Sequence, residues 1–328
     1  MPEKRFVGRG DLPEDPTRKV DDPLKDPAGY SASDELANAV NVALSLRMPL
    51  LVTGDPGTGK TQLAFRIAAE LGFGKVLRFD TKSSSVATEL FYQFDSVRQF
   101  TQSQLNAATQ RRLPQATDFV RWHAMGLAIL RTLPPDSSDL ARLGDSHPRH
   151  DAPMRSLVLI DEIDKAPRDF PNDLLNQMEN YEFFVPELQM HFAASRNAQL
   201  APVVLITSNS ERQLPEAFLR RCVYHHIEFP KDAHELHHLL EPRLKAIQLA
   251  EVATRDAVQR FFRLREDRGF SRAPSTSELL DWLRALRSEG FFESGAQARQ
   301  KEVLLATAGT LFKTREDLSR ALDLHFAA

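Results

Sequence analysis

The chain has 328 residues, of which 42% are hydrophobic and 27% charged, so it can bury a full core and is long enough for two domains. A net charge of -3 without a long run of Lys and Arg gives no sign of a nucleic-acid-binding surface. Cys222 is the only cysteine and no apolar string is long enough to span a bilayer, so neither an intrachain disulfide nor a membrane span is expected. The single cysteine fits a reducing compartment, so we expect a cytoplasmic protein, and the N-terminal residues lack an apolar signal segment.

Residues 1–29 form the predicted N-terminal segment. Prolines at 13, 16, 23 and 27 among many Asp and Lys residues predict that residues 11–29 are extended and solvated, with part of the segment able to pack across a nucleotide. A helix is expected next, from a cap at Ser31 or Ser33 to about Arg47. Its predicted apolar face consists of Leu36, Val40, Ala43 and Leu44.

A glycine-rich loop, Gly-x4-Gly-Lys-Thr at 54–61, follows a short apolar run and precedes a predicted helix at 62–71. Backbone N–H groups of such a loop and the positive end of the helix bind phosphate oxygens. Lys60 is expected to reach the β- and γ-phosphates, and the Thr61 hydroxyl to hold Mg²⁺. The alternative is a glycine-rich turn without chemistry. The predicted nucleotide-binding residues here are Gly54, Asp55, Pro56, Gly57, Thr58, Gly59, Lys60, Thr61 and Gln62.

A strand is predicted at 76–80, followed by a polar loop at 81–85. Residues 101–155 have the least clear secondary-structure pattern in the chain. Within them, the helical spacing of five residues predicts one helix face, namely Phe119, Trp122, Gly126, Ile129 and Leu133. We expect an insertion with its own helices and assign it no role.

Four apolar residues at 157–160 without alternation predict a strand buried on both faces, as in a parallel sheet. Asp161 and Glu162 follow at its carboxyl end, where open α/β sheets bind their ligands. Asp161 is expected to hold Mg²⁺ directly or through water, and Glu162 to orient and deprotonate an attacking water. The alternative is a solvated strand end.

A hairpin is predicted from strands at 181–186 and 188–192, before a buried strand that ends at Asn209. The Asn209 amide can hydrogen-bond the γ-phosphate or the attacking water, or it is an ordinary strand-end asparagine. The remaining predicted elements are a short helix at 214–221, a last strand at 223–229 and an almost wholly helical second domain after residue 231.

The ordered motifs resemble the AAA+ ATPases, specifically the MoxR branch. The segments that carry the likeness are GDPGTGKT at 54–61, LVLIDEIDKAP at 157–167, VVLITSN at 203–209 and LPEAFLRRC at 214–222, with APSTSELLDW at 273–282 extending it. The resemblance implies an α/β fold in which a P-loop AAA+ parallel sheet of five strands, flanked by helices, spans 30–230. A smaller all-α lid domain is implied for 231–328. It also implies a ring, usually a hexamer, with ATP and Mg²⁺ bound between subunits.

The same resemblance suggests roles for individual residues. Asp161 and Glu162 match the second nucleotide motif, and Asn209 matches the first sensor, which favours its functional interpretation. Arg221 lines up with the arginine that reaches into the neighbouring subunit's site. Arg220 is the alternative, and a plain surface arginine pair would be favoured without the family pattern.

The second sensor of such proteins is an arginine near the start of a lid helix. Ser275 occupies the matching position here, so either Arg272, three residues earlier, reaches the γ-phosphate or the role is absent. The hairpin at 181–192 is similar to a hairpin that faces the ring's pore in this branch.

Two further patterns suggest other chemistry. His234-Glu235-x-x-His238 has the spacing of zinc proteases, but the stretch is rich in histidine and no clear third ligand follows, which favours a solvated or structural helix face. Arginines and aromatics at 261–268 can meet nucleic acid, but the interleaved acids favour a subunit contact or a solvated helix. Leu279, Leu280, Leu283 and Leu286 are spaced as a lid core, with Trp282 flanking them.

The function that the resemblance implies is ATP hydrolysis coupled to remodelling or maturation of a partner protein, in this branch often a von Willebrand A-domain protein. The alternative is a nucleic-acid-acting AAA+ motor or restriction-type NTPase, whose hydrolysis would depend steeply on salt. A third possibility is a non-catalytic nucleotide-binding scaffold. The residues that speak against it are Lys60, Thr61, Asp161, Glu162 and Asn209.

Overall fold

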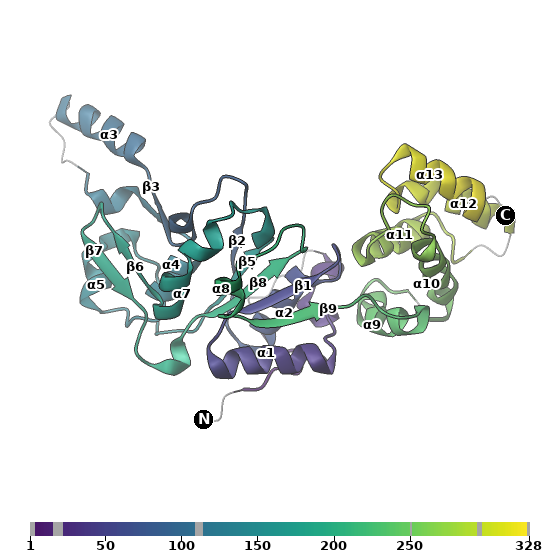
Figure 1. The fold of residues 1–328 in the computed structure, drawn as a ribbon, viewed down its shortest axis with the longest axis horizontal. Coiled ribbons are helices and arrows are strands. Elements are labelled where there is room, and N and C mark those ends of the chain that lie inside the picture. The colour runs from purple at the N-terminus through teal and green to yellow at the C-terminus, as the bar shows by residue number, and fades with distance from the viewer. Residues whose placement is uncertain (1–3, 16–21, 109–113, 250, 294–296, 327–328) are drawn as a thin grey trace. The chain divides into compact units, whose positions relative to one another are not determined.

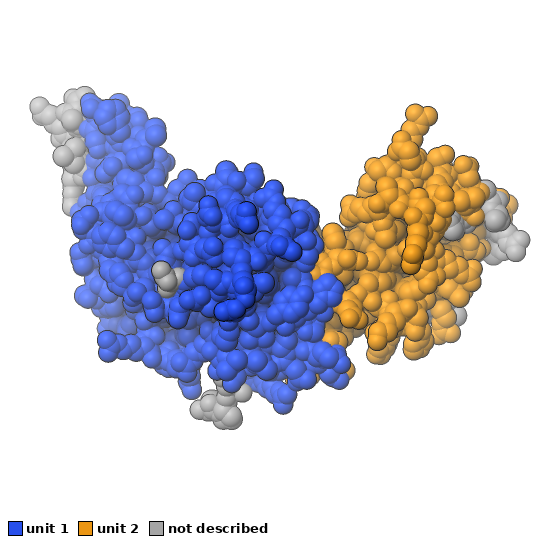
Figure 2. Space-filling view, in the orientation of Figure 1, with its two compact units in different colours: residues 1–6, 34–53, 67–226 blue, residues 7–33, 54–66, 227–328 orange. Residues whose placement is uncertain are grey.

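The computed structural model describes residues 4–15, 22–108, 114–249, 251–293 and 297–326. The chain divides into two compact units, coloured separately in Figure 2. Unit 1 comprises residues 1–6, 34–53 and 67–226, and unit 2 comprises residues 7–33, 54–66 and 227–328.

Five strands form a parallel sheet (Figure 1). Its strands are β1 (Leu50–Gly54), β2 (Leu77–Asp80), β5 (Leu157–Asp161), β8 (Val203–Ser208) and β9 (Val223–Ile227), in the order β2-β5-β8-β1-β9. Every residue of β5 is buried, as the unbroken apolar run predicts for a strand covered on both faces. The predicted α/β fold is therefore confirmed.

Helices flank the sheet within unit 1, among them α4 (Ala124–Leu130) of the segment between β2 and β5. Others are α1 (Asp34–Leu46), α6 (Phe170–Asp173), α7 (Leu175–Asn180) and α8 (Glu216–Leu219), while α2 (Lys60–Leu71) begins in unit 2 and ends in unit 1. The apolar face predicted for α1 is buried, at Leu36, Val40, Ala43 and Leu44.

The segment between β2 and β5 differs from its prediction. It contains η3 (Ala87–Leu90), β3 (Tyr92–Phe94), α3 (Ser96–Ala108), η4 (Ala116–Phe119), β4 (Val120–Trp122), α4 (Ala124–Leu130), α5 (Ser138–Arg142) and η5 (Gly144–Ser146). The single helix face from Phe119 to Leu133 is wrong, because β4 pairs antiparallel with β3 and interrupts it. Residues 109–113 lie outside the described part.

The hairpin predicted at 181–192 is confirmed as β6 (Glu182–Val185) paired antiparallel with β7 (Met190–Ala193). Phe183 and Phe192 face each other across it and are buried. The Trp122 ring packs on both, with ring centroids 6.1 and 5.5 Å away. These aromatic contacts explain why Trp122 lies in a strand despite its helical spacing, since packing overrides local periodicity.

Unit 2 contains the C-terminal helical region, made of α9 (Ala233–Ala246), α10 (Glu251–Glu266), α11 (Thr276–Ser288), α12 (Gln297–Thr307), η8 (Ala308–Thr310), α13 (Arg315–Ala321) and η9 (Leu322–Phe326). The predicted leucine core of α11 is buried. Trp282, predicted to flank it, is fully buried as well and donates its indole N–H to the Thr307 hydroxyl at 3.0 Å. No helix within the described ranges combines the length and apolar character needed to cross a membrane.

The N-terminal segment is less extended than predicted. Two short 3-10 turns, η1 (Pro23–Lys25) and η2 (Pro27–Gly29), occupy its second half, and Leu24 packs into the core of the helical region. Phe6 is 1% exposed in unit 1 and exchanges hydrogen bonds with the Asn41 side chain at 2.9 and 2.8 Å. The parts of this prediction at 1–3 and 16–21 lie outside the described residues.

Candidate nucleotide site

The glycine-rich loop lies in unit 2 and has the backbone shape that its glycines allow. Gly54, Gly57 and Gly59 have φ of 147°, 80° and 90°, a region that residues with a Cβ rarely adopt. A Cβ on Gly57 would also lie 2.5 Å from the Ser275 Cβ. Glycine is therefore required at 57 by conformation and by close packing.

Lys60 is the first residue of α2 and is 6% exposed. Its ammonium group donates to the carbonyl oxygens of Gly54 at 2.6 Å and Asp55 at 2.9 Å. A fixed cation therefore lies within the loop, at the positive end of a 12-residue helix. This combination binds phosphate. Thr61 is the second residue of the same helix.

An unexpected residue of the helical region, Arg265 in α10, contacts this loop within unit 2. Its Nη2 donates to Asp55 Oδ2 at 2.6 Å, and its Nη1 donates to the Pro274 carbonyl at 2.8 Å. Its guanidinium also lies 3.7 Å from the centroid of the Phe229 ring. The sequence predicts a subunit contact or a solvated helix for residues 261–268. No local pattern there indicates that Arg265 contacts a residue 210 positions away.

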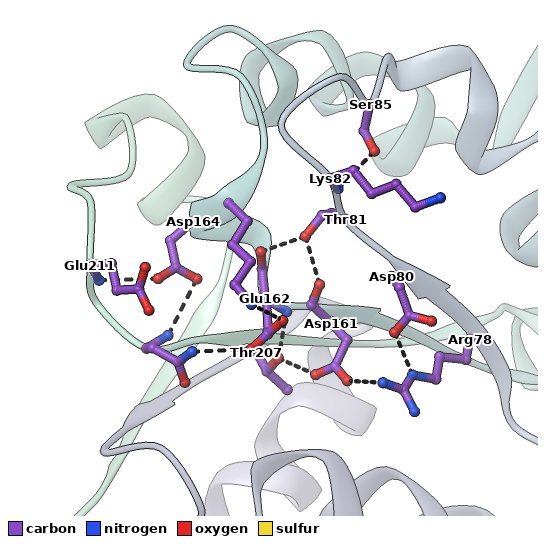
Figure 3. Close-up of polar contacts among 12 residues, drawn as sticks. Arg78, Asp80, Thr81, Lys82, Ser85, Asp161, Glu162, Asp164, Thr207 and Glu211 are labelled. Carbon is purple, nitrogen blue, oxygen red and sulfur yellow. Dashed lines mark hydrogen bonds and ion pairs between the residues drawn. The ribbon is translucent and has the colours of Figure 1, made fainter. Parts of the chain in front are cut away.

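Asp161 lies in unit 1 at the end of β5 and is 4% exposed (Figure 3). Its Oδ1 accepts a hydrogen bond from the Thr207 hydroxyl of β8 at 2.6 Å, and its Oδ2 is 2.9 Å from Arg78 Nη2 of β2. The Thr207 hydroxyl also accepts the backbone N–H of Glu162 at 2.9 Å. Three adjacent strands therefore fix this carboxylate, and sequence reasoning missed both Arg78 and Thr207.

Glu162 follows Asp161 in a left-handed backbone conformation, with φ of 57°. Its Oε1 is 3.3 Å from Asn209 Nδ2, which donates to it, and its Oε2 is 2.5 Å from Lys165 Nζ. The hydrogen bond between Lys165 and Glu162 is the main cause of the raised pKa of Lys165. The structure thus brings the predicted base and the predicted sensor amide together, and adds a lysine that the sequence did not single out.

Asp164, which is 3% exposed, anchors the loop that carries Asn209. Its carboxylate accepts the backbone N–H groups of Asn209 at 3.3 Å and Glu211 at 3.0 Å. On the other side, the Thr81 hydroxyl donates to the Asp161 carbonyl at 2.7 Å and to that of Glu162 (Figure 3). Buried and partly buried hydrogen bonds therefore hold the backbone around Asp161, Glu162 and Asn209 in place.

Arg220 and Arg221 lie at the exposed end of α8 in unit 1. Arg220 pairs with Glu216, and Arg221 Nε is 3.5 Å from Glu179 Oε2. Both line a cavity of about 590 Å³ together with Cys222, whose thiol pKa burial raises to about 12. The two arginines are accessible, and neither is joined to the carboxylate cluster by a described contact.

Arg272 and the position that aligns with the second sensor occupy the start of α11. Ser275 is the helix N-cap and receives the N–H of Glu278 at 3.4 Å. The Arg272 side chain is 57% exposed, with Nη2 3.8 Å from Glu278 Oε1. Arg272 therefore pairs loosely with the capping carboxylate.

On α9, the residues with the zinc-protease spacing make contacts with other residues in or next to the same helix. Glu235 accepts the Lys231 N–H at 2.8 Å, and His238 is 3.6 Å from Glu241. His237, between the motif histidines, is buried and bonds Thr254 at 2.9 Å. Over the part of the chain that the structure describes, no group of three or more His, Cys, Asp or Glu side chains is arranged to hold a metal.

A parallel sheet with a phosphate-binding loop after β1 and a carboxylate pair at the end of β5 defines the class of P-loop nucleoside triphosphatases. Residues 49–222, more than half of the chain, match the family model of the AAA domain (dynein-related subfamily), and the chain belongs to this family. No curated protein matches the chain. Membership implies nucleotide binding and ATPase activity, and AAA proteins often form oligomers.

Proposed function

We propose that the chain is a MoxR-type AAA+ ATPase that hydrolyses ATP in a homo-oligomeric ring, a hexamer, and remodels or matures a partner protein in the cytoplasm. In this proposal, residues 30–230 form the nucleotide-binding domain and residues 231–328 the lid. The order of the four motifs at 54–61, 157–167, 203–209 and 214–222 supports the assignment to this branch. A protein with a von Willebrand A domain is the partner we propose.

The observation that carries the proposal of hydrolysis is the contact of Asn209 with Glu162, next to Asp161. A carboxylate at this place can take a proton from water, and a neighbouring amide can orient that water toward the γ-phosphate. Lys60 and the backbone N–H groups of its loop bind the β- and γ-phosphates in this proposal. The Lys165 ammonium lies 2.5 Å from Glu162 Oε2 and is the charged partner of the proposed base.

The donors proposed for Mg²⁺ are the Asp161 carboxylate and the Thr61 hydroxyl. Both are hard oxygen ligands of the kind that Mg²⁺ prefers, and the hydrogen bond from Thr207 fixes the carboxylate, so the residues fit the ion. These two oxygens would hold the ion, which would supply positive charge to the bound phosphates.

The arginine proposed to act on a neighbouring subunit's nucleotide is Arg221, with Arg220 as the alternative. Their exposure on α8 supports a role outside the chain's own carboxylate cluster. An arginine supplied in this way contributes about 10³–10⁵ in rate in related enzymes. Arg272 as a second sensor remains a prediction, and its high exposure leaves its side chain accessible to a ligand.

The direct test measures ATP hydrolysis as a function of protein concentration, since a shared site requires assembly. Glu162→Gln should lower the rate by about 10²–10⁴-fold while ATP binding persists. Glu211→Gln, two residues beyond Asn209, is the matched control and should keep the wild-type rate. A Glu162→Gln protein that hydrolyses ATP normally would contradict the proposal.

The Glu162→Gln protein also tests the partner, because a ring that holds ATP without cleaving it should retain its client in a pull-down. Hydrolysis stimulated by DNA or RNA, with a steep salt dependence, would instead favour the nucleic-acid motor.

A further inference from the structure

Arg78 places a permanent cation on the carboxylate proposed to hold Mg²⁺. Its Nη2 lies 2.9 Å from Asp161 Oδ2, and its Nε lies 2.6 Å from Asp80 Oδ1. Figure 3 shows the guanidinium between the two carboxylates. Arg78 and Asp80 are two residues apart on β2, so their side chains lie on the same face of the strand.

The two carboxylates differ in their surroundings. The Asp161 side chain is 6% exposed, whereas that of Asp80 is 62% exposed. A buried carboxylate is costly unless it is paired and hydrogen-bonded. Thr207 bonds one oxygen of Asp161, and Arg78 neutralises the other.

A guanidinium and a magnesium ion cannot occupy the same oxygen of Asp161, since they repel each other and compete for space. We propose that Arg78 is an exchangeable counter-ion of Asp161, which Mg²⁺ with nucleotide displaces onto Asp80. The inference rests on the proposed function, because it concerns the same metal site. Arg78 is a positioning residue here, since it acts through Asp161.

The structure provides a place for the displaced guanidinium. Asp80 already accepts from Nε, and a guanidinium carries further donors that can make the contact bidentate. β2 is an edge strand of the sheet, and the Arg78 side chain is 46% exposed, which leaves it room to turn toward solvent. The exchange therefore needs a side-chain rotation and no change in the strand.

The proposal predicts opposite effects for two substitutions. Arg78→Met removes the competitor, so Mg²⁺ should bind more readily. Asp80→Asn removes the charge that receives Arg78, so the guanidinium should stay on Asp161 and Mg²⁺ should bind less readily. A merely structural role would weaken binding in both variants.

The experiment titrates Mg²⁺ and follows the binding of a non-hydrolysable ATP analogue by the full-length protein. Arg78→Met should lower the Mg²⁺ concentration at half-saturation about fivefold, and Asp80→Asn should raise it about twofold, in line with a partly exposed ion pair. Lys82→Met is the matched control, because it removes a nearby exposed cation that has no described contact with Asp161. Its midpoint should stay close to that of the wild type.

Thermal unfolding without nucleotide gives a second readout, in which Arg78→Met should lower the midpoint temperature and saturating Mg²⁺ with the analogue should reduce the difference. Should Arg78→Met not fold, Asp80→Asn still tests the proposal, because it leaves Asp161 and its partners in place. If the wild type, Arg78→Met and Asp80→Asn all bind nucleotide and have the same Mg²⁺ midpoint, this inference is overturned and the proposed function is not. A wild type that binds no nucleotide would overturn it together with the proposed function.

Discussion

The phosphate loop and the carboxylate cluster are held in place by different means. The loop is shaped by its own backbone, through glycines at positive φ and a lysine that bonds loop carbonyls. The cluster depends on side chains from β2, β5 and β8, which bond one another across the sheet. A contiguous motif can thus shape the loop, whereas the carboxylates of the cluster depend on residues far along the chain.

One side chain from far along the chain also supports the loop. Arg265 joins Asp55 to Pro274 and stacks on Phe229, all within unit 2. The contrast between the two regions is therefore one of degree, and substitutions can measure it.

The largest effect is expected in the loop, from Gly57→Ala. A side chain at φ of 80° costs about 1–3 kcal/mol, and its Cβ would meet the Ser275 side chain, so ATP affinity should fall at least about tenfold. Equilibrium binding of ATP measures it. Gly72→Ala is the control, since Gly72 has a φ of 76° with open space around it, and should leave affinity unchanged. If Gly57→Ala binds ATP as tightly as the wild type, the shape of the loop does not depend on Gly57.

In the cluster, Thr207→Val should destabilise the protein by about 1–3 kcal/mol. It removes the hydroxyl that donates to Asp161 Oδ1 and accepts the Glu162 N–H, at a position that is 0% exposed. Urea unfolding measures the change. Thr207→Ser keeps the hydroxyl and should retain most of the stability. If the valine variant is as stable as the wild type, the cluster does not rely on this cross-strand contact.

Arg265→Met tests the outer support of the loop. Loss of the pair with Asp55 should weaken ATP binding about fivefold, because the loop loses one fixed point while its backbone remains intact. Arg263→Met, exposed on the same helix, serves as the control. The contact is coupled to Asp55 only if Asp55→Asn in the Arg265→Met background causes less loss than it does alone.

The smallest effect concerns pH and a histidine of the sheet, a residue type that the loop motif at 54–61 does not contain. In the sheet, burial lowers the pKa of His225 from its ordinary value of 6.5, with Glu35 opposing the shift. The unfolded chain then binds the proton more readily, so stability should fall as pH drops below about 6.5. His225→Asn should flatten this part of the pH profile in urea unfolding. An unchanged slope would show that His225 does not contribute.

Much of the fold was predictable because it is encoded locally. The buried runs before Asp161 and Asn209, the hairpin and the helical C-terminal region follow from patterns within a few residues. The helix face assigned to Phe119–Leu133 failed because Trp122 packs against Phe183 and Phe192 of the hairpin. The prediction of a solvated N-terminal segment is wrong at Leu24, because the hydrophobic core of the C-terminal helical region buries this residue.

The sequence by itself determined the phosphate loop, the carboxylate pair and the family, since each depends on contiguous residues whose backbone and chemistry act together. Only the tertiary structure decided which side chains support them. The register that sets Asp80 beside Asp161 brings Arg78 to that carboxylate, and the pairing of Ile160 with Ile206 brings Thr207 there. Such contacts join residues 46 or more positions apart, and strand order and register, which no local pattern specifies, create them.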